Sequence, residues 1–99
     1  MSKLRDAARG MDCMIRLPCC NHDPETTVLA HYRNNGLGAG MGIKPANWLG
    51  AWSCSACHDA VDGRSKVDYE NIRLAHAEGV LRTLAELDKR GILSLGNRL

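Results

Sequence analysis

The stretch CSACHD, residues 54–59, places two thiols and an imidazole within five consecutive positions. Two cysteines separated by two residues at the start of a helix can direct both sulfur atoms to one point, so Cys54 and Cys57 are predicted to form half of a metal site. His58 directly follows Cys57, and successive helical side chains point about 100° apart. The stretch therefore predicts a structural metal site and a separate role for His58.

The other half of the metal site must come from the upstream cysteines, as Cys13 with either Cys19 or Cys20. These pairs have the spacings C-x5-C and C-x6-C, which are wider than the usual knuckle of roughly two to four intervening residues. A turn at Leu17-Pro18 can fold the extra length back. We favour Cys20 as the ligand and Cys19 as the spare thiol, although the spacing alone leaves both open.

Size and composition indicate that this domain needs a metal to stabilise it in addition to its apolar core. The chain has 99 residues, no Phe and two Trp. One domain over residues 1–99 is expected, and so small a domain often needs a staple beyond its apolar core. Trp48 and Trp52 are interpreted as core anchors rather than base-stacking surfaces. Buried free thiols or a redox C-x-x-C are the less favoured alternatives to zinc, because the residues before Cys54 do not form a clean buried strand of the thioredoxin type.

The N-terminal sequence bears on the cellular compartment. MSKLRDAARGMDC carries charges and no apolar run, so it does not resemble a secretory signal peptide. No segment approaches the roughly 20 apolar residues that a membrane span needs. We therefore expect a cytoplasmic protein with no membrane association, in which cysteines bind metal rather than pair. The net charge of +2 is compatible with a nucleic-acid partner but does not require one.

Local patterns predict an α+β fold with a long C-terminal helix. The expected elements in the first half are a short helix over 2–10, a strand from Cys13 into a turn at Pro18, a strand over 26–32 and a glycine-rich loop over 36–42. A short helix is expected from 53 or 55 to about 62, with Gly63 as its stop, and a long helix from about 68 to 90, with Gly91 after it. One side of the long helix carries apolar residues at helical spacing: Ile72, Val80, Leu84 and Leu87. A knuckle, a strand pair, a loop and a helix with the last two cysteines make a treble-clef-like ββα arrangement.

The histidines offer a second kind of chemistry. His58 and Asp62 lie four residues apart on one helical face and can share a divalent metal such as Mg²⁺, Mn²⁺ or Zn²⁺, or simply stabilise the helix as a surface pair. His31 ends the strand over 26–32, where a neutral imidazole can take a proton from water, although a partly buried structural histidine is the alternative. His22 and His76 are interpreted as structural or solvated.

A known family shares these features. A hairpin that ends in His, followed by a loop and then C-x-x-C-H at the start of a helix, resembles the HNH (ββα-metal) endonucleases with a zinc-bound treble clef. More narrowly, the segments RDAARGMDCMIRLP, PETTVLAHYR and GAWSCSACHDAVDGR are similar to a family of small lambdoid phage and prophage proteins regarded as nucleases. The narrower resemblance covers nearly the whole chain.

The resemblance implies a role for each of these residues. His31 would match the general base, His58 the metal-binding histidine that closes the HNH motif, and Asp62 a further helix ligand. Structural zinc would be held by Cys13, Cys20, Cys54 and Cys57.

The chain departs from the nuclease pattern at two positions. Nuclease sites of this type usually carry His or Asp immediately before the base, and here that position is Ala30. The middle Asn of the motif is matched by Asn47, which lies farther before Cys54 than usual, with Asn34 and Asn35 as other candidates. The first metal shell therefore looks incomplete in the sequence.

The leading expectation is a metal-dependent endonuclease that hydrolyses DNA phosphodiester bonds in phage recombination or DNA processing, in the cytoplasm of a bacterial host. Arg33, Lys44 and Arg64 would grip phosphates next to the cleaved one, without a fixed recognition sequence. One alternative is a non-catalytic zinc module that binds DNA or a phage replication or recombination protein. Another is a subunit whose site a partner or dimer mate completes, with the long helix as the interface.

Overall fold

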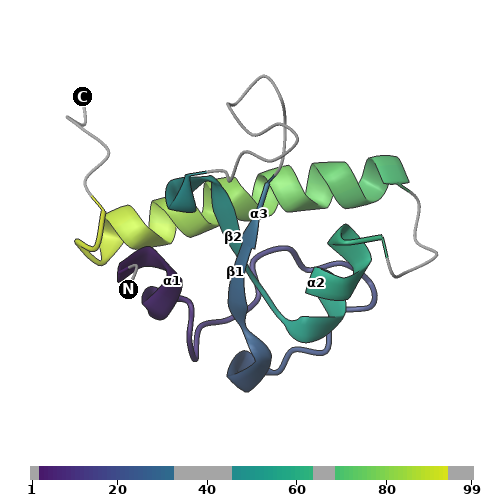
Figure 1. Ribbon diagram of the computed structural model, residues 1–99, viewed down its shortest axis with the longest axis horizontal. Coiled ribbons are helices and arrows are strands. Elements are labelled where there is room, and N and C mark those ends of the chain that lie inside the picture. Colours follow the sequence, from purple (N-terminus) through teal and green to yellow (C-terminus); the bar gives the residue numbers. More distant parts are fainter. Residues whose placement is uncertain (1–2, 33–45, 64–68, 94–99) are drawn as a thin grey trace.

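The computed structural model describes residues 3–32, 46–63 and 69–93. Phosphate-binding candidates Arg33, Lys44 and Arg64 lie outside these ranges, as do Asn34 and Asn35. The elements, shown in Figure 1, are α1 (Lys3–Ala7), η1 (Pro24–Thr26), β1 (Val28–His31), η3 (Asn47–Leu49), β2 (Gly50–Ser53), α2 (Ser55–Val61) and α3 (Tyr69–Lys89). The predicted α+β content with a long C-terminal helix is confirmed.

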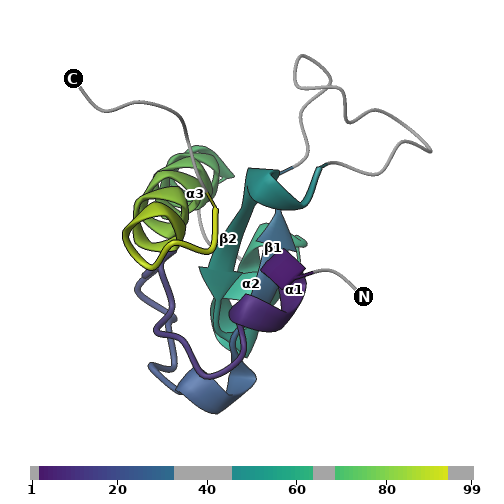
Figure 2. The ribbon, with the colours of Figure 1, turned by 90° about the vertical axis from the view of Figure 1, so that its left-hand side faces the viewer.

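The two strands form an antiparallel pair that the helices cover. Leu29 lies opposite Trp52 and His31 lies opposite Gly50. α3 crosses the pair on the side of β2, while α1 and α2 lie on opposite faces of the pair (Figures 1 and 2). The end of β1 that carries His31 therefore lies beside the start of β2, on the edge of the pair away from most of the α3 contacts.

Strand alternation divides the core into two clusters. Ala30 packs with the buried cysteines and with Ile72 and Val80 of α3. Leu29, the preceding residue, packs instead with Trp52 in a second cluster that also holds residues of α1. Successive strand side chains point to opposite faces. The side chain of His31 therefore lies on the same face of β1 as that of Leu29, and Ala30 lies on the other face.

The buried face of α3 carries polar groups among its apolar residues. Ile72, Val80 and Leu87 are buried, as the helical spacing predicts. Thr83 lies on the same face with no solvent exposure, and its hydroxyl oxygen accepts a hydrogen bond of 2.9 Å from the backbone N–H of Trp52. This bond satisfies a strand donor that would otherwise be buried without a partner.

A glycine lets α3 approach the strands closely. A Cβ atom at Gly79 would lie 3.0 Å from Ile15 Cγ1, 3.1 Å from the Met14 carbonyl oxygen and 3.2 Å from Ala51 Cβ. Gly79→Val is therefore expected to lower the free energy of unfolding by about 1–3 kcal/mol, which urea denaturation would measure. Ala85→Val, on the exposed side of the same helix, reports the cost of a β-branched residue alone. Equal losses in the two variants would contradict the packing argument.

The helix ends follow the sequence signals. α2 gives way to Gly63, whose φ is 84°, and α3 gives way to Gly91, whose φ is 71°. The N–H groups of Gly91 and Ile92 bond back to the carbonyls of Asp88 and Leu87, so the left-handed glycine closes the last turn of the long helix.

Three sequence expectations were wrong. The residues before Cys54 form a strand, β2, whose four residues are all buried, where no clean buried strand was expected. The segment from Cys13 to Pro18 is not a strand, because Arg16 adopts a left-handed φ of 58° and the chain turns instead of extending. Trp48 is not a core anchor, since 49% of it is exposed, whereas Trp52 is 1% exposed. Among the described helices, none has the length and apolar character to cross a membrane.

Candidate metal centre and hairpin site

Four cysteines from distant parts of the chain converge on one point. The sulfur atoms of Cys13, Cys20, Cys54 and Cys57 all lie within 4.8 Å of one another. A tetrahedral zinc with Zn–S bonds of about 2.3 Å needs sulfur atoms about 3.8 Å apart. The separation of 3.7 Å between Cys20 Sγ and Cys54 Sγ fits that requirement. The cluster can therefore hold a metal ion such as zinc.

Local backbone structure brings the sulfur atoms together. Cys54 is the N-cap of α2, and its Sγ accepts a hydrogen bond of 3.4 Å from the backbone N–H of Cys57. A turn closed by a bond of 2.9 Å from the Cys20 N–H to the Leu17 carbonyl returns the upstream segment to the cluster. The left-handed backbone at Arg16 contributes the same reversal. These turns absorb the unusually long spacing between the upstream cysteines.

The pKa values of the clustered cysteine thiols differ from one another. A hydrogen bond with Cys57 lowers the pKa of Cys13 to about 4, whereas burial raises the pKa of Cys20 to about 11. The hydrogen bond to Cys13 raises the pKa of Cys57 well above its usual range. These shifts favour the thiolate at Cys13 and the protonated thiol at Cys20 and Cys57, whereas a cation at the centre would favour the thiolate form of its ligands. Metal binding at this site must therefore release protons.

The structure also distinguishes the two neighbouring upstream cysteines. Cys19 is exposed, and its Sγ lies 3.8 Å from the Ala56 carbonyl oxygen rather than in the cluster. Cys20 is partly buried, and its Sγ lies 3.7 Å from His22 Nδ1. The alternative that spacing left open is therefore resolved in favour of Cys20 as the clustered cysteine.

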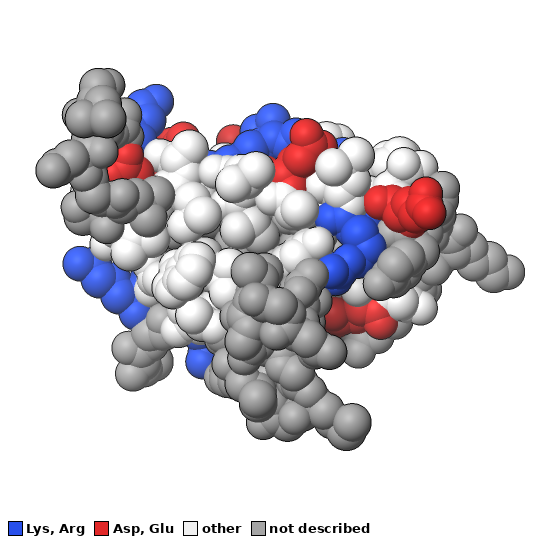
Figure 3. Space-filling model, turned by 90° about the horizontal axis from the view of Figure 1, so that it is seen from above, with Lys and Arg blue, Asp and Glu red and all other residues white. Residues whose placement is uncertain are grey.

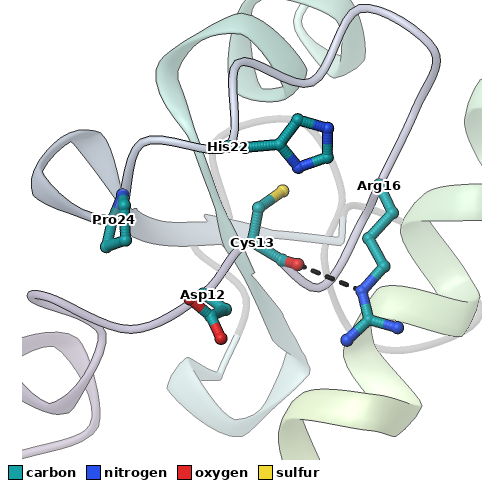
Figure 4. Close-up of a pocket in the computed structure, with 5 residues that line it drawn as sticks. All are labelled: Asp12, Cys13, Arg16, His22 and Pro24. Atoms are coloured by element: carbon teal, nitrogen blue, oxygen red, sulfur yellow. Dashed lines mark hydrogen bonds between the residues drawn. The ribbon is translucent and has the colours of Figure 1, made fainter.

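A cavity of about 360 Å³ opens beside the cysteines. Figure 4 shows the His22 ring next to the Cys13 sulfur, with Asp12, Arg16 and Pro24 around the opening. Arg16 and His22 both have left-handed backbones, with φ values of 58° and 55°. The cavity adjoins the cysteine cluster through Cys13. None of the residues that line it belongs to the predicted catalytic set.

The predicted base is paired with an asparagine. His31 Nε2 lies 2.8 Å from Asn47 Oδ1, across 16 residues of sequence. An amide oxygen only accepts hydrogen bonds, so Nε2 carries the proton in the neutral ring and Nδ1 keeps its lone pair. The structure therefore places Asn47 against His31.

Ala30, the residue before the predicted base, faces the core. Its side chain is 1% exposed and packs inside the core cluster of the cysteines. A carboxylate or imidazole at this position would have to be buried among apolar side chains. The inward direction of residue 30 therefore disfavours a metal ligand at this position.

His58 and Asp62 meet on the surface of α2. His58 Nε2 lies 3.5 Å from Asp62 Oδ2, with side-chain exposures of 37% and 44%. Within the described residues, the four cysteines are the only group of three or more His, Cys, Asp or Glu side chains that lie close enough together to share a metal. His31 is therefore a separate base candidate, and His58 and Asp62 are a pair of candidate metal ligands. The three side chains do not form a compact cluster of their own.

Charge on one face of the molecule is mixed. In Figure 3, Lys and Arg side chains lie among Asp and Glu and form no continuous basic area on the part of that face that the structure describes. Elsewhere in the described residues, two ion pairs of α3 join basic and acidic side chains: Arg82 with Glu78, and Arg90 with Glu86. A broad electrostatic surface for a nucleic acid is thus absent from this described face.

His76 is a buried histidine whose environment the sequence did not reveal. It is 5% exposed, and its Nε2 donates a hydrogen bond of 2.9 Å to the Ala30 carbonyl oxygen. Burial lowers the pKa of His76, the bond to Ala30 opposes that shift, and the charge of Arg73 adds to it. The neutral form is therefore favoured in the folded chain.

This environment gives a pH prediction. The unfolded chain has a histidine pKa of about 6.5, so between that value and the lower folded pKa of His76 the unfolded state binds more protons. The contribution of neutral His76 to stability is complete above about pH 6.5 and is lost as the pH falls towards the folded pKa. We expect the wild type to lose more stability than His76→Gln on acidification, in denaturation curves at buffered zinc. Parallel losses would contradict this expectation.

Comparison with known proteins places the chain. Residues 2–92 match the protein family described as "Putative nuclease YbcO". This chain belongs to that family. A YbcO family protein of Escherichia coli (strain K12), named "Putative nuclease YbcO", is 44% identical over 95 residues, which cover 94% of this chain and 98% of the relative. A protein of Enterobacteria phage 82 with the same description has the same identity and coverage.

A solved structure extends the comparison to the fold. The structure described as "Structure of a putative bacteriophage protein from Escherichia coli str. K-12 substr. MG1655" is 40% identical to this YbcO family chain, with a TM-score of 0.77. The match covers 90% of this chain and 100% of that chain. The predicted kinship with small phage and prophage proteins is confirmed.

Proposed function

We propose that this YbcO family chain is a metal-dependent endonuclease of the HNH-like, treble-clef type that hydrolyses phosphodiester bonds in DNA. Membership of a family described as "Putative nuclease YbcO" is the observation that carries the proposal. We further propose a role in phage recombination or DNA processing, which the occurrence of a relative in Enterobacteria phage 82 supports. The hairpin histidine and the cysteine cluster support the HNH-like assignment, because both occur where the motif of that class has them.

His31 is proposed as the general base. Its bond to Asn47 leaves Nδ1 as the nitrogen with a lone pair, which can take a proton from an attacking water. The Asn47 contact also fixes the plane of the ring, so the imidazole does not need to reorient during the reaction. Asn47 is thereby proposed as the asparagine of the motif.

His58 and Asp62 are proposed to hold one divalent cation, Mg²⁺, Mn²⁺ or Zn²⁺, which when bound would neutralise the scissile phosphate and stabilise the leaving 3′-oxygen. Their partial exposure leaves room for a phosphate oxygen and water to complete the shell. Arg33, Lys44 and Arg64 remain the predicted contacts to flanking phosphates. Zinc at the four cysteines is proposed to be structural only, because all four positions of a tetrahedral ion would be filled by protein sulfur.

A purified-protein assay tests the proposal. Metal analysis should find about one tightly held zinc per chain. Cleavage of plasmid and branched DNA would then be measured with Mg²⁺, Mn²⁺ and Ni²⁺ added separately. Absence of cleavage of both substrates with all three ions would overturn the proposed function.

The burial of Ala30 favours a second candidate function. With only two ligands in the described residues, the chain would be a zinc module that binds DNA or a phage replication or recombination protein without cutting. DNA binding without cleavage, unchanged in His31→Ala, would support this reading.

A partner or dimer mate could instead complete the site. The exposed Leu74 and Leu81, which lie one heptad apart on α3, offer a surface for such a partner. Sedimentation of the pure chain tests the homodimer.

A further inference from the structure

His76 of α3 is a buried titratable residue that the proposed reaction does not use. Its ring Nε2 lies 2.9 Å from the carbonyl oxygen of Ala30, the residue immediately before His31. A carbonyl oxygen only accepts, so Nε2 carries the proton and donates it. The bond joins positions 46 residues apart and ties the long helix directly to the strand of the proposed base.

The residue after His31 is held from the same helix. The Tyr32 and His76 rings meet edge to face, with centroids 5.1 Å apart and planes at 76°. The Arg73 guanidinium lies 4.3 Å above the centre of the Tyr32 ring. The Tyr32 N–H also donates a bond of 2.7 Å to the Leu49 carbonyl oxygen. Both neighbours of His31 are thus fixed, and His76 contacts both.

We propose that His76 is a positioning residue for His31, an inference that rests on the proposed function. The imidazole of His31 is held at its Nε2 by Asn47 from η3, while His76 holds the backbone from which that imidazole projects. Together the two contacts determine where His31 Nδ1 points. A displacement of a reacting group by about 1 Å can cost 10²-fold in rate, so such a hold affects turnover more than substrate binding.

The surroundings of His76 suit this role. Burial is the main cause of its lowered pKa, and the charges of Asp62 and His58 act on the ring in opposite directions. His76 therefore lies within electrostatic reach of the proposed metal pair as well as in contact with the strand of the proposed base. A neutral ring at this position donates its bond without adding a positive charge to that region.

Cleavage kinetics of three variants test the proposal. His76→Ala removes the donor, His76→Gln replaces Nε2–H with an amide N–H of similar reach, and Thr83→Val is the matched control. Thr83 is another buried polar residue of α3 that bonds a strand backbone, but at Trp52, which pairs with Leu29 rather than His31. We expect His76→Ala to lower kcat at least about 10-fold with KM changed less than about twofold. His76→Gln should recover most of kcat, and Thr83→Val should leave kcat near the wild-type value.

Three results would overturn the positioning role: an unchanged kcat in folded His76→Ala, an equal loss in Thr83→Val, or no recovery in folded His76→Gln. A readout without substrate separates this inference from the function on which it rests. Nitrogen NMR of the His31 ring should show its Nε2–H signal shifted or broadened in His76→Ala and restored in His76→Gln. A wild type that cleaves nothing would refute the nuclease, whereas unchanged His31 signals in all variants would refute the positioning by His76.

Discussion

Replacing Cys57 by serine is expected to abolish tight metal binding and, with it, the folded state of the chain. Cys57 has no solvent exposure and lies in the four-sulfur cluster. Structural zinc contributes on the order of 10–16 kcal/mol of apparent binding free energy in small zinc domains, which is as large as the roughly 5–15 kcal/mol stability of a typical protein. Metal analysis together with circular dichroism would show a loss of both zinc and cooperative unfolding.

Cys19→Ser is the matched control for this result. Cys19 is exposed, and its Sγ bonds to the Ala56 carbonyl rather than to the cluster. We expect this variant to keep about one zinc per chain and an unfolding curve close to that of the wild type. Zinc retained by folded Cys57→Ser, or lost from Cys19→Ser, would show that the cluster is not the metal site.

Much of the frame follows from local sequence signals. The C-x-x-C pair at a helix start, the glycines after α2 and α3 and the apolar spacing of α3 are properties of neighbouring residues, and each appears in the structure as predicted. The wide spacing between Cys13 and the next cysteines was less informative, because a turn can bring either Cys19 or Cys20 to the cluster. Only the folded positions of Cys19 and Cys20 separate the two.

The features that sequence reasoning missed depend on contacts between distant residues. His76 and Thr83 sit on the apolar face of α3 because strand groups of Ala30 and Trp52 need partners there. No local pattern reports that need. Trp48 and Trp52 are chemically alike, yet one is half exposed and the other buried, because only position 52 lies in the strand that α3 covers.

His31→Ala is expected to lower the rate of DNA cleavage by about 10²–10⁴-fold, the usual contribution of a general base. The variant removes Nδ1 as proton acceptor and leaves zinc binding intact, because the His31 contact is to Asn47 and not to a cysteine. Single-turnover cleavage of the best substrate found, at saturating divalent ion, would measure the loss. DNA binding should change little, since the base acts on water rather than on the phosphates.

His22→Ala is the control that separates base chemistry from histidine loss in general. His22 is exposed and lies near Cys20 Sγ at 3.7 Å, so zinc content must be measured in both variants. At full zinc occupancy we expect His22→Ala to cleave within a few-fold of the wild type. If His31→Ala cleaves equally well, the hairpin histidine is structural and the hydrolysis must use another base. If neither protein cleaves but both bind DNA, the buried Ala30 marks a zinc module that has kept the nuclease scaffold without its metal shell.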